Sequence, residues 1–435
     1  MSTFDPKGQT PPASTVAVLG LGYIGLPTAA ILATAGLRVI GMDIDPRVVE
    51  AVNAGEVPFT EPELGVTVAG AVSLGLLSAQ GTVPEADTYI VAVPTPFAED
   101  KSADLSYIRA AAGQIAERLK GGELVILEST SPPGTTRLMA DEILGIRPDL
   151  SLDGTGGRPV VRFAHCPERV LPGRIMAELV SNDRIVGGLT PEATLAAAEL
   201  YATFCKAEIH LTDATTAEMA KLAENAYRDV NIAFANELSL ISDRLGLDVW
   251  ELIGLANKHP RVDILRPGPG VGGHCIAVDP WFIVAADPEN SRLIRSARTV
   301  NDSKPGHVVR QVLDAVGEAV DSTVAVLGLA FKADVDDFRE SPALGIAAEL
   351  SRTLPNARLL VAEPYAESLP AELAASPNTS LVTATDAVSR ADVVVLLVDH
   401  QQFRAIDPEL LSGKTVLDTR GVWHTTDGHL LERSE

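Results

Sequence analysis

The stretch Thr15–Asp45 reads TVAVLGLGYIGLPTAAILATAGLRVIGMDID and decides the fold of the first half of the chain. An apolar run leads into a glycine turn, a helical run of small and apolar residues follows, and a second apolar run ends at an aspartate. This order fits one strand, helix and strand of a parallel sheet. Gly20, Gly22 and Gly25 form the pattern GxGxxG directly after the first strand, which predicts a dinucleotide-binding turn.

Each glycine of this turn has a predicted mechanical role. Gly20 makes the turn, Gly22 lets the backbone approach a pyrophosphate, and Gly25 lets the helix pack closely on the strand. Asp43 ends the second strand, where a carboxylate accepts hydrogen bonds from the adenosine ribose and repels a 2′-phosphate. The predicted cofactor is therefore NAD rather than NADP.

Two further apolar runs extend the predicted sheet. TYIVAVPTP at 88–96 and ELVILEST at 123–130 both end in polar or proline residues. Ligands sit at the carboxyl ends of strands in open parallel sheets, so these ends belong to the predicted cofactor site. The cofactor-binding residues predicted from the sequence are Gly20, Gly22, Tyr23, Ile24, Gly25, Asp43, Arg47, Pro94, Thr95 and Thr130.

The last third of the chain repeats this pattern. The segment from Ser322 resembles the first strand and turn, and two later runs, ADVVVLLVDH and KTVLDTR, resemble the other two strands. A second doubly wound domain is therefore predicted. Its first turn reads GLAFKA in place of GLGYIG, so it is expected to bind something other than a dinucleotide. Lys332, Arg339 and Arg420 at its strand ends are cations suited to phosphate.

A long helix is predicted between the two halves. Residues 213–246 contain no proline, and their one glycine is the last residue, Gly246. A helix of ~30 residues spans about 45 Å, which suits an element that joins two domains and a dimer partner. Lys221 and Asn225 lie four residues apart and therefore share a face of this helix. Small and apolar neighbours predict burial of both at a domain junction.

The predicted fold class is α/β, with two doubly wound Rossmann-like parallel-sheet domains joined by a central helical region. The alanine-, valine- and glycine-rich composition, with 4% aromatic residues, suits helices packed closely on parallel strands. The predicted parts are a disordered N-terminus at 1–13, an NAD-binding domain at 14–210, a central helical region at 211–310 and a second doubly wound domain at 311–435.

Charge and cysteine content exclude several classes of partner. Lysine and arginine number 35 against 58 aspartates and glutamates, so the formal charge is −23 and neither nucleic acid nor an anionic membrane is an expected partner. The chain has an odd number of cysteines, namely Cys166, Cys205 and Cys275. Their spacing does not fit a metal site, so no metal is predicted. With no apolar signal core or spanning run, the expected location is the cytoplasm.

The segment Gly268–Trp281, GPGVGGHCIAVDPW, contains the third cysteine in a loop of four glycines. Glycine and proline exclude a regular helix or central strand there, and the following IAVDPWFIV starts a short helix or strand. Cys275 is then placed where free backbone N–H groups lower a thiol pKa. A buried structural cysteine is the alternative. The glycines and the neighbours His274 and Asp279 favour a nucleophile.

A nicotinamide site and a nucleophilic thiol together indicate one chemistry. An alcohol is oxidised to an aldehyde, the aldehyde is trapped on sulfur, and the thiohemiacetal is oxidised to a thioester that water hydrolyses to an acid. Lys221 and Asn225 are the candidates for stabilising the oxyanion. The candidates for holding or deprotonating the water are Thr130, Glu168 and Asp279.

The motifs together resemble the nucleotide-sugar 6-dehydrogenase family, whose relatives act on UDP-glucose and GDP-mannose. The resemblance covers nearly the whole chain after residue 13. It is carried by GLGYIGLP, VPTP at 93–96, ESTSPPGTT at 128–136, HCPERVLPGR at 165–174, the KLAEN helix, the cysteine loop and GLAFKADVDDFRESP at 328–342.

This resemblance implies a homodimer that binds NAD and a UDP-sugar, with Cys275 as the nucleophile. It implies that the helical region at 211–310 is the dimerisation region and that the domain at 311–435 is the UDP-sugar-binding domain. It also implies Lys221 and Asn225 at the oxyanion, and Thr130, Glu168 and Asp279 around the catalytic water. The substrate-binding residues it implies are Arg169, Val170, Lys221, Asn225, Arg228, His259, Arg261, Gly272, Lys332, Arg339 and Arg420.

One position separates branches of this family. Members that oxidise UDP-glucose usually carry lysine before the loop aspartate, whereas this chain has Val278 before Asp279. The loop and NKHPRVDIL at 257–265 resemble the branch that oxidises UDP-N-acetyl-D-mannosamine to its uronic acid, a precursor of surface polysaccharide. A 2-acetamido group needs a donor, which His259, Arg261 or His274 could supply.

Three alternatives stay open at this point. The same chemistry could act on UDP-N-acetylglucosamine or UDP-glucose. A two-electron β-hydroxyacid-type dehydrogenase would use Lys221 as acid and base and keep Cys275 as a structural residue, although the second doubly wound domain argues against it. A nucleotide-sugar sensor without activity is also possible on this fold.

Overall fold

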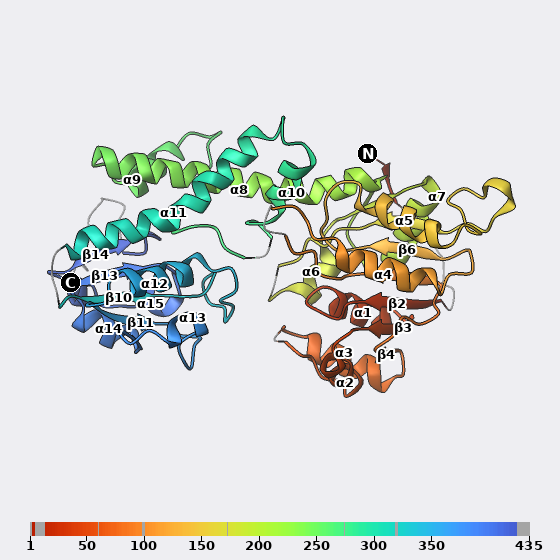
Figure 1. Ribbon diagram of the computed structural model, residues 1–435, viewed down its shortest axis with the longest axis horizontal. Coiled ribbons are helices and arrows are strands. Elements are labelled where there is room, and N and C mark those ends of the chain that lie inside the picture. Colours follow the sequence, from red (N-terminus) through yellow and green to blue (C-terminus); the bar gives the residue numbers. More distant parts are fainter. Residues whose placement is uncertain are drawn as a thin grey trace. The chain divides into compact units, whose positions relative to one another are not determined.

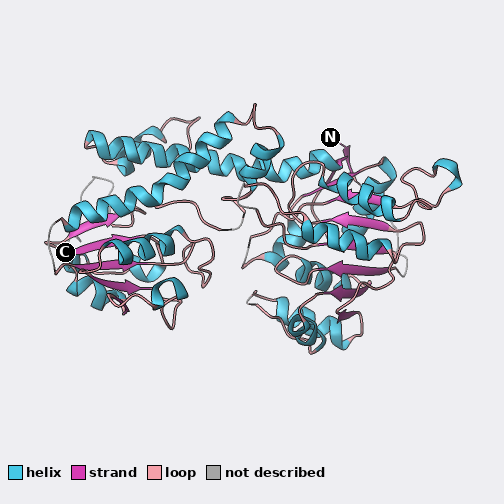
Figure 2. Cartoon of the chain, viewed as in Figure 1, coloured by secondary structure: helices cyan, strands magenta, loops and turns pink. Residues whose placement is uncertain are grey.

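The computed structural model describes residues 2–4, 14–59, 61–97, 101–171, 173–273, 275–317 and 321–423. The chain forms two compact units (Figure 1). The first contains Met1–Glu224 and Trp281–Asp287, and the second contains Asn225–Pro280 and Pro288–Glu435. Both are sheets covered by helices, as the magenta strands and cyan helices of Figure 2 show, so the predicted α/β class is confirmed.

The predicted strand, helix and strand of the first unit are present. They are β2 (Thr15–Leu19), α1 (Gly25–Thr34) and β3 (Arg38–Met42), and β2 pairs in parallel with β3. Four of the five residues of β2 are buried. A parallel strand covered on both faces by helices has to be apolar along its length, which is why its sequence is a continuous apolar run.

The sheet of the first unit has the strand order β1-β9-β8-β7-β6-β5-β2-β3-β4. Strands β2 to β7 run parallel, whereas β8 pairs antiparallel with β7 and parallel with β9. Its other strands are β4 (Leu77–Gln80), β5 (Thr88–Val91), β6 (Leu124–Leu127), β7 (Arg162–His165), β8 (Arg184–Gly188) and β9 (Ile209–Asp213). Its other helices are α2 (Pro46–Asn53), α3 (Leu64–Ser73), α4 (Ser106–Ala116), α5 (Thr135–Ile146), α6 (Ile175–Ser181) and α7 (Pro191–Tyr201).

The N-terminus departs from the predicted disorder at residues 2–4. Strand β1 (Ser2–Thr3) pairs antiparallel with β9, and the Phe4 N–H donates to the Ile209 carbonyl oxygen at 3.0 Å. The physical reason is that β9 is otherwise an edge strand, whose backbone groups accept an added strand. The rest of the predicted disordered segment, residues 1 and 5–13, lies outside the described residues.

The predicted long helix is confirmed as α8 (Ala214–Leu245), of 32 residues. The boundary between the two units falls inside it, after Glu224. A second long helix, α11 (Arg292–Val316), runs through the predicted boundary at residue 310. The division into three domains therefore stays a prediction. Within the described residues, no helix combines the length and the apolar character needed to cross a bilayer.

The second unit contains the predicted second doubly wound sheet, all parallel, in the order β12-β11-β10-β13-β14. The chain therefore leaves β10 in one direction and returns on its other side, which places the point of reversal between β10 and β13. The strands are β10 (Thr323–Leu327), β11 (Arg358–Ala362), β12 (Thr379–Leu381), β13 (Val393–Leu396) and β14 (Thr415–Asp418). Its helices besides α8 and α11 include α9 (Val249–Ala256), α12 (Pro342–Thr353), α13 (Ala371–Ala374), α14 (Ala384–Arg390) and α15 (Gln401–Arg404).

Candidate functional site

The glycine turn of the first unit is shaped by close backbone contacts. Gly20 has φ +89°, and a Cβ there would lie 2.5 Å from the Ala92 carbonyl oxygen. A Cβ on Gly25 would lie 1.8 Å from the Gly20 carbonyl oxygen. By contrast, a Cβ on Gly22 would meet no atom within 4 Å. The turn is thus closed where strand and helix meet and open where a pyrophosphate would approach, which fits a dinucleotide.

Asp43 lies beside this turn with its carboxylate oriented by the backbone. Its Oδ2 accepts the Leu21 N–H and its Oδ1 accepts the Asp45 N–H, both at 2.9 Å. The side chain is half-buried, and each of its oxygens keeps a further lone pair that can accept a ribose hydroxyl. Arg47 pairs with Asp45 at 2.7 Å on the exposed start of α2, and its hydrogen bond lowers the pKa of Asp45. Exposed Tyr23, next to Ile24, stacks on Phe59 with ring centroids 4.2 Å apart.

The carboxyl ends of β5 and β6 are tied to each other. The Thr95 hydroxyl donates to the Thr130 carbonyl oxygen at 2.6 Å, and the Ser129 hydroxyl donates to the Val93 carbonyl oxygen at 2.7 Å. These bonds bring two predicted cofactor residues, Thr95 and Thr130, together at the end of the sheet where ligands bind. Pro94 lies between the two bonded positions on the β5 side.

Glu168 lies after β7 and is buried. Its Oε1 accepts the Arg169 N–H at 2.7 Å, and its Oε2 lies 3.1 Å from a guanidinium nitrogen of Arg184. Arg169 in turn pairs through its side chain with Glu224 on α8 at 2.7 Å. Val170, the next predicted substrate residue, is half-buried. The candidate water carboxylate is therefore held in one orientation by a backbone and a side-chain donor.

Sequence reasoning missed two buried residues next to this carboxylate. Arg184 begins strand β8, and Glu128 directly follows β6, with bonds to the hydroxyls of Thr28 and Tyr201, both at 3.1 Å. Burial raises the pKa of Glu128 to about 7, with the nearby Glu168 adding to the rise. The signal that could have found both is a charged residue at a buried strand position, which is uncommon without a partner.

Helix α8 is continuous and carries both Lys221 and Asn225, which confirms that the two residues lie on one helix. Lys221 is half-buried in the first unit, and Asn225 is buried in the second. The start of α8 is anchored by Glu218, whose carboxylate accepts the N–H groups of Gly134 at 2.5 Å and Thr136 at 2.7 Å. Arg228, a predicted substrate residue one turn beyond Asn225, is exposed.

The thiol segment of the second unit leads into a helix, α10 (Asp279–Ala286). The carbonyl oxygen of Cys275 accepts the N–H groups of Val278 at 3.1 Å and Asp279 at 2.8 Å, so the cysteine begins the turn that precedes α10. Cys275 is exposed, which excludes the buried structural alternative, whereas Cys166 and Cys205 are buried. The Asn225 amide donates to the Asp279 carboxylate at 2.5 Å, so two predicted catalytic residues are in direct contact.

The glycines of this loop allow a close fit to the segment after β10. A Cβ on Gly272 would lie 2.6 Å from Pro342 and 2.7 Å from the Glu340 carbonyl oxygen. A Cβ on Gly268 would lie 2.6 Å from a guanidinium nitrogen of Arg420. Only glycine fits at these two positions unless a neighbour moves, so the loop that carries the thiol is positioned by its contacts within the second unit.

The remaining predicted substrate residues of the second unit pair mostly with their own neighbours, and the Arg261 N–H donates to the His259 Nδ1 at 3.3 Å. Arg420 pairs with Asp399 at 3.0 Å, and Arg339 pairs with Asp337 at 2.6 Å. Lys332 is exposed. His259 and Arg261 are exposed in the turn after α9, and His274 lies outside the described residues.

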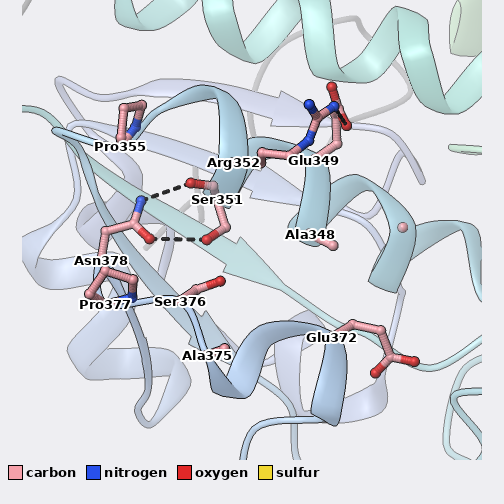
Figure 3. A pocket seen from close by; sticks show the side chains of 11 residues that line it. Ala348, Glu349, Ser351, Arg352, Pro355, Glu372, Ala375, Ser376, Pro377 and Asn378 are labelled. Carbon is pink, nitrogen blue, oxygen red and sulfur yellow. Dashed lines mark hydrogen bonds and ion pairs between the residues drawn. The ribbon is translucent and has the colours of Figure 1, made fainter.

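A hollow of about 480 Å³ on the second unit lies apart from these residues (Figure 3). It is lined by α12, α13 and the segment before β12. Ser351 and Asn378 bond across it, with the Ser351 hydroxyl donating to the Asn378 amide oxygen at 3.0 Å. Arg352 in its wall pairs with Glu349. None of the predicted site residues lines this hollow.

Comparison with known proteins gives three successive domain matches. They are the NAD-binding domain of the UDP-glucose/GDP-mannose dehydrogenase family at 14–205, its central domain at 215–303 and its UDP-binding domain at 325–425. The NDP-N-acetyl-D-galactosaminuronic acid dehydrogenase of Ralstonia nicotianae is 54% identical over 413 residues, which cover 94% of this chain and 96% of that protein.

Two further relatives are both named for a different sugar. The UDP-N-acetyl-D-mannosamine dehydrogenase of Salmonella typhi is 52% identical over 419 residues, which cover 94% of this chain and 99% of that protein. The solved structure of the UDP-N-acetyl-mannosamine dehydrogenase Cap5O from S. aureus is 40% identical, with a TM-score of 0.82, covering 94% of this chain and 95% of that one.

Proposed function

The chain belongs to the UDP-glucose/GDP-mannose dehydrogenase family and is an NAD-dependent oxidoreductase, and from this premise we propose that it oxidises UDP-N-acetyl-D-mannosamine at C6 to the uronate. The observation that carries the proposal is exposed Cys275 in a glycine loop ahead of α10, in a chain that also has an open dinucleotide turn. The mannosamine assignment is supported by the Salmonella and S. aureus relatives and by Val278.

The proposed reaction removes two hydrides from C6 of the sugar. NAD, when bound, accepts one hydride in each oxidation. Between them, the Cys275 thiolate adds to the aldehyde carbon, and the resulting thiohemiacetal carries the hydrogen that leaves as the second hydride. Water then adds to the thioester, the carbon–sulfur bond breaks, and the acid and the free thiol are released.

Other residues of the chain are assigned to stabilising the oxyanion and to holding or deprotonating the water. Lys221 and Asn225 stabilise the oxyanion that forms when sulfur or water adds to the carbonyl carbon. Glu168 and Asp279 are the carboxylates that hold or deprotonate the water, together with the Thr130 hydroxyl. The bond between Asn225 and Asp279 keeps one of these carboxylates fixed in the second unit.

A second candidate is the same chemistry on another N-acetylated nucleotide sugar. The Ralstonia relative, named for N-acetyl-D-galactosaminuronic acid, is as similar to this chain as the mannosamine relatives are. The two sugars differ in configuration and share the acetamido group. His259 and Arg261 are the described donors that we assign to this group.

We propose that the enzyme is a homodimer that uses α8. Four of the large apolar side chains exposed along this helix follow one another at spacings of seven, seven and four residues: Tyr227, Phe234, Ile241 and Leu245, with exposed fractions of 70%, 54%, 45% and 64%. This spacing repeats on one face of a helix, and an apolar stripe of this length on a water-soluble chain is typical of an interface. A second copy of the same helix is its proposed partner.

We propose that the protein works in the cytoplasm and supplies a uronic acid sugar for surface polysaccharide. The chain has three cysteines, an odd number in a chain of 435 residues, which suits a reducing compartment.

The experiment that tests the proposed function is the yield of NADH from a limiting amount of UDP-N-acetyl-D-mannosamine with NAD in excess, followed by NADH absorbance. Two NADH per sugar, lost in Cys275→Ser, are expected. One NADH per sugar would contradict the role of Cys275 as the nucleophile of the second oxidation. No NADH from this sugar, with turnover of the galactosamine epimer or of UDP-glucose, would keep the chemistry and overturn the substrate.

A further inference from the structure

A buried guanidinium lies directly behind Glu168 in the first unit. Arg184 is 4% exposed, and its Nη2 lies 3.1 Å from the Glu168 Oε2. The guanidinium carbon lies over the rings of Tyr201 and Phe204, at 4.8 Å and 5.0 Å from their centroids. A planar cation held between a carboxylate and two aromatic rings has little freedom to turn, so the direction of its N–H groups is fixed.

A second carboxyl group belongs to the same cluster. Glu128 is 1% exposed and bonds to two neutral hydroxyls, that of Thr28 on α1 and that of Tyr201 on α7. Two residues after it comes Thr130, which is assigned to the catalytic water. The cluster therefore contains one cation and two carboxyl groups in a region from which water is largely excluded.

One cation neutralises one carboxylate, and the geometry selects Glu168. The ion pair at 3.1 Å is to Glu168, while Glu128 has hydroxyl donors only. A buried carboxyl without its own cation favours the neutral form. Burial, followed by the charge of Glu168, accordingly raises the pKa of Glu128 to about 7, against the opposing effect of Arg184. Ionisation of Glu128 would place a second negative charge beside the same guanidinium.

The two oxygens of Glu168 retain acceptor capacity for a water molecule. Each accepts one donor, the Arg169 N–H on Oε1 and the Arg184 guanidinium on Oε2. A carboxylate oxygen accepts two hydrogen bonds, so each oxygen keeps one further lone pair. Because both existing donors are fixed, the direction of the remaining lone pairs is fixed as well.

We propose that Arg184 is a positioning residue that fixes Glu168 as the ionised carboxylate orienting the hydrolytic water, and that Glu128 competes for the same guanidinium when it ionises. The inference rests on the proposed function, since it concerns the hydrolysis of the thioester on Cys275. Arg184 touches neither substrate nor cofactor in this role. It acts only through Glu168.

The decisive variant is Arg184→Lys, which keeps the charge and removes the planar fork. The first-turnover formation of NADH from UDP-N-acetyl-D-mannosamine and NAD is expected at the wild-type rate, because it precedes hydrolysis. The steady-state kcat is expected to fall about 10²-fold, as when a reacting group is misplaced by about 1 Å. Mass spectrometry of the quenched enzyme should then find the sugar bound to Cys275.

Arg162→Lys is the matched control. Arg162 lies on the neighbouring strand β7 and donates from an exposed guanidinium to the Gly122 carbonyl oxygen at 3.0 Å. It should behave as the wild type. A kcat of Arg184→Lys equal to that of the control, or a loss confined to the first turnover, would overturn the inference.

A second variant keeps the guanidinium and tests Glu128 itself. Glu128→Gln preserves the neutral shape, so hydrolysis by the wild type should slow as the pH rises through about 7, and the variant should lose this dependence. Three groups around Glu128 do not titrate there: burial raises the pKa of Cys166 to about 12 and raises that of Tyr201, while the pKa of Arg184 is raised by Glu168 against burial. Burial lowers the pKa of neighbouring His165 to about 3.

An unchanged pH dependence in Glu128→Gln, or none in the wild type, would contradict this part of the inference, even if Arg184→Lys does not fold. Failure of the proposed function is recognised separately in the wild type. One NADH per sugar would remove the thioester and overturn both proposals. Two NADH per sugar with an unaffected Arg184→Lys would overturn the inference alone.

Discussion

The first turn of the N-terminal sheet and the first turn of the C-terminal sheet share three backbone features. Gly20 has φ +89° and Gly328 has φ +94°. The Gly20 N–H donates to the Met42 carbonyl oxygen at 2.8 Å, and the Gly328 N–H donates to the Ala362 carbonyl oxygen at 2.9 Å. In both, an acidic residue comes after the second strand and accepts backbone N–H groups from the turn. The two regions differ in the segment that the turn leads into.

After the first turn, helix α1 begins at Gly25, and half-buried Asp43 keeps acceptor capacity. After the second turn, the next helix is α12, which begins only at Pro342. The counterpart carboxylate, Glu363, is buried and bonds to His400 at 3.2 Å.

The tautomer of that histidine is fixed by its neighbours. The Nδ1 of His400 accepts the Asp334 N–H at 2.9 Å, so its proton is on Nε2 and is donated to Glu363. The side chain of this histidine is fully buried. One turn thus offers a helix N-terminus and an available carboxylate to a ligand, and the other offers neither. The comparison shows that a strand-turn pattern predicts a backbone shape, whereas binding depends on the groups that surround it.

The largest effect that sharpens this comparison is expected for Gly25→Ala. The new Cβ would lie 1.8 Å from the Gly20 carbonyl oxygen, so the helix must shift. Such overpacking costs about 1–3 kcal/mol, or up to roughly a hundredfold in NAD affinity. Calorimetric titration with NAD measures it. The matched control is Ala333→Gly at the corresponding place of the second turn, and a loss of NAD affinity there would contradict the assignment of NAD to the first turn.

A smaller effect is expected for Asp43→Ala. Loss of hydrogen bonds from the ribose to a charged acceptor costs about 1.5 kcal/mol, or roughly tenfold in NAD affinity. NADP should bind better than to the wild type, because the repulsion of its 2′-phosphate is removed. Titration with both cofactors checks this. Equal weakening of NAD and NADP would show that the carboxylate does not face the ribose.

Glu363→Gln is expected to affect folding and not the cofactor. Removal of a buried charge that accepts from His400 and the Leu329 N–H should lower the free energy of unfolding by about 1 kcal/mol. Urea unfolding measures this loss, and NAD affinity should stay at the wild-type value. A changed NAD affinity would mean that the second turn is not closed as described.

The smallest effect is the pH dependence of that same carboxyl group. Burial opposes its ionisation, but hydrogen bonds from His400 and from the Leu329 and Tyr365 N–H groups lower the pKa of Glu363 below its usual 4.5. Its stabilising contribution is therefore complete above about pH 4.5 and is lost as the pH falls through the lowered pKa. Urea unfolding of the wild type should show this loss below pH 4.5, and Glu363→Gln should lack it. A variant with the same acid dependence would refute the assignment.

Local patterns in the sequence were sufficient for much of the fold. The glycine turn at Gly20, the parallel strands β2, β3, β5 and β6 of the first sheet, the second doubly wound sheet and the long helix α8 were predicted because each depends on backbone sterics, capping and hydrophobic periodicity within a few tens of residues. The antiparallel pairing of β8 with β7 was not predicted. The placement of Cys275 in a loop ahead of a regular element also followed from its glycine and proline neighbours. The structure shows that this element is helix α10 and that Cys275 is exposed. The roles assigned to these residues in catalysis stay predictions.

The sequence by itself therefore determined the predicted strands and helices, the open dinucleotide turn and the placement of the thiol in a loop. Only the tertiary structure decided which charges meet: Arg184 with Glu168 and His400 with Glu363. It also decided that β1 closes an open sheet edge. These contacts join segments that lie on different strands, and their energies depend on burial and on the absence of competing water, neither of which a local pattern specifies.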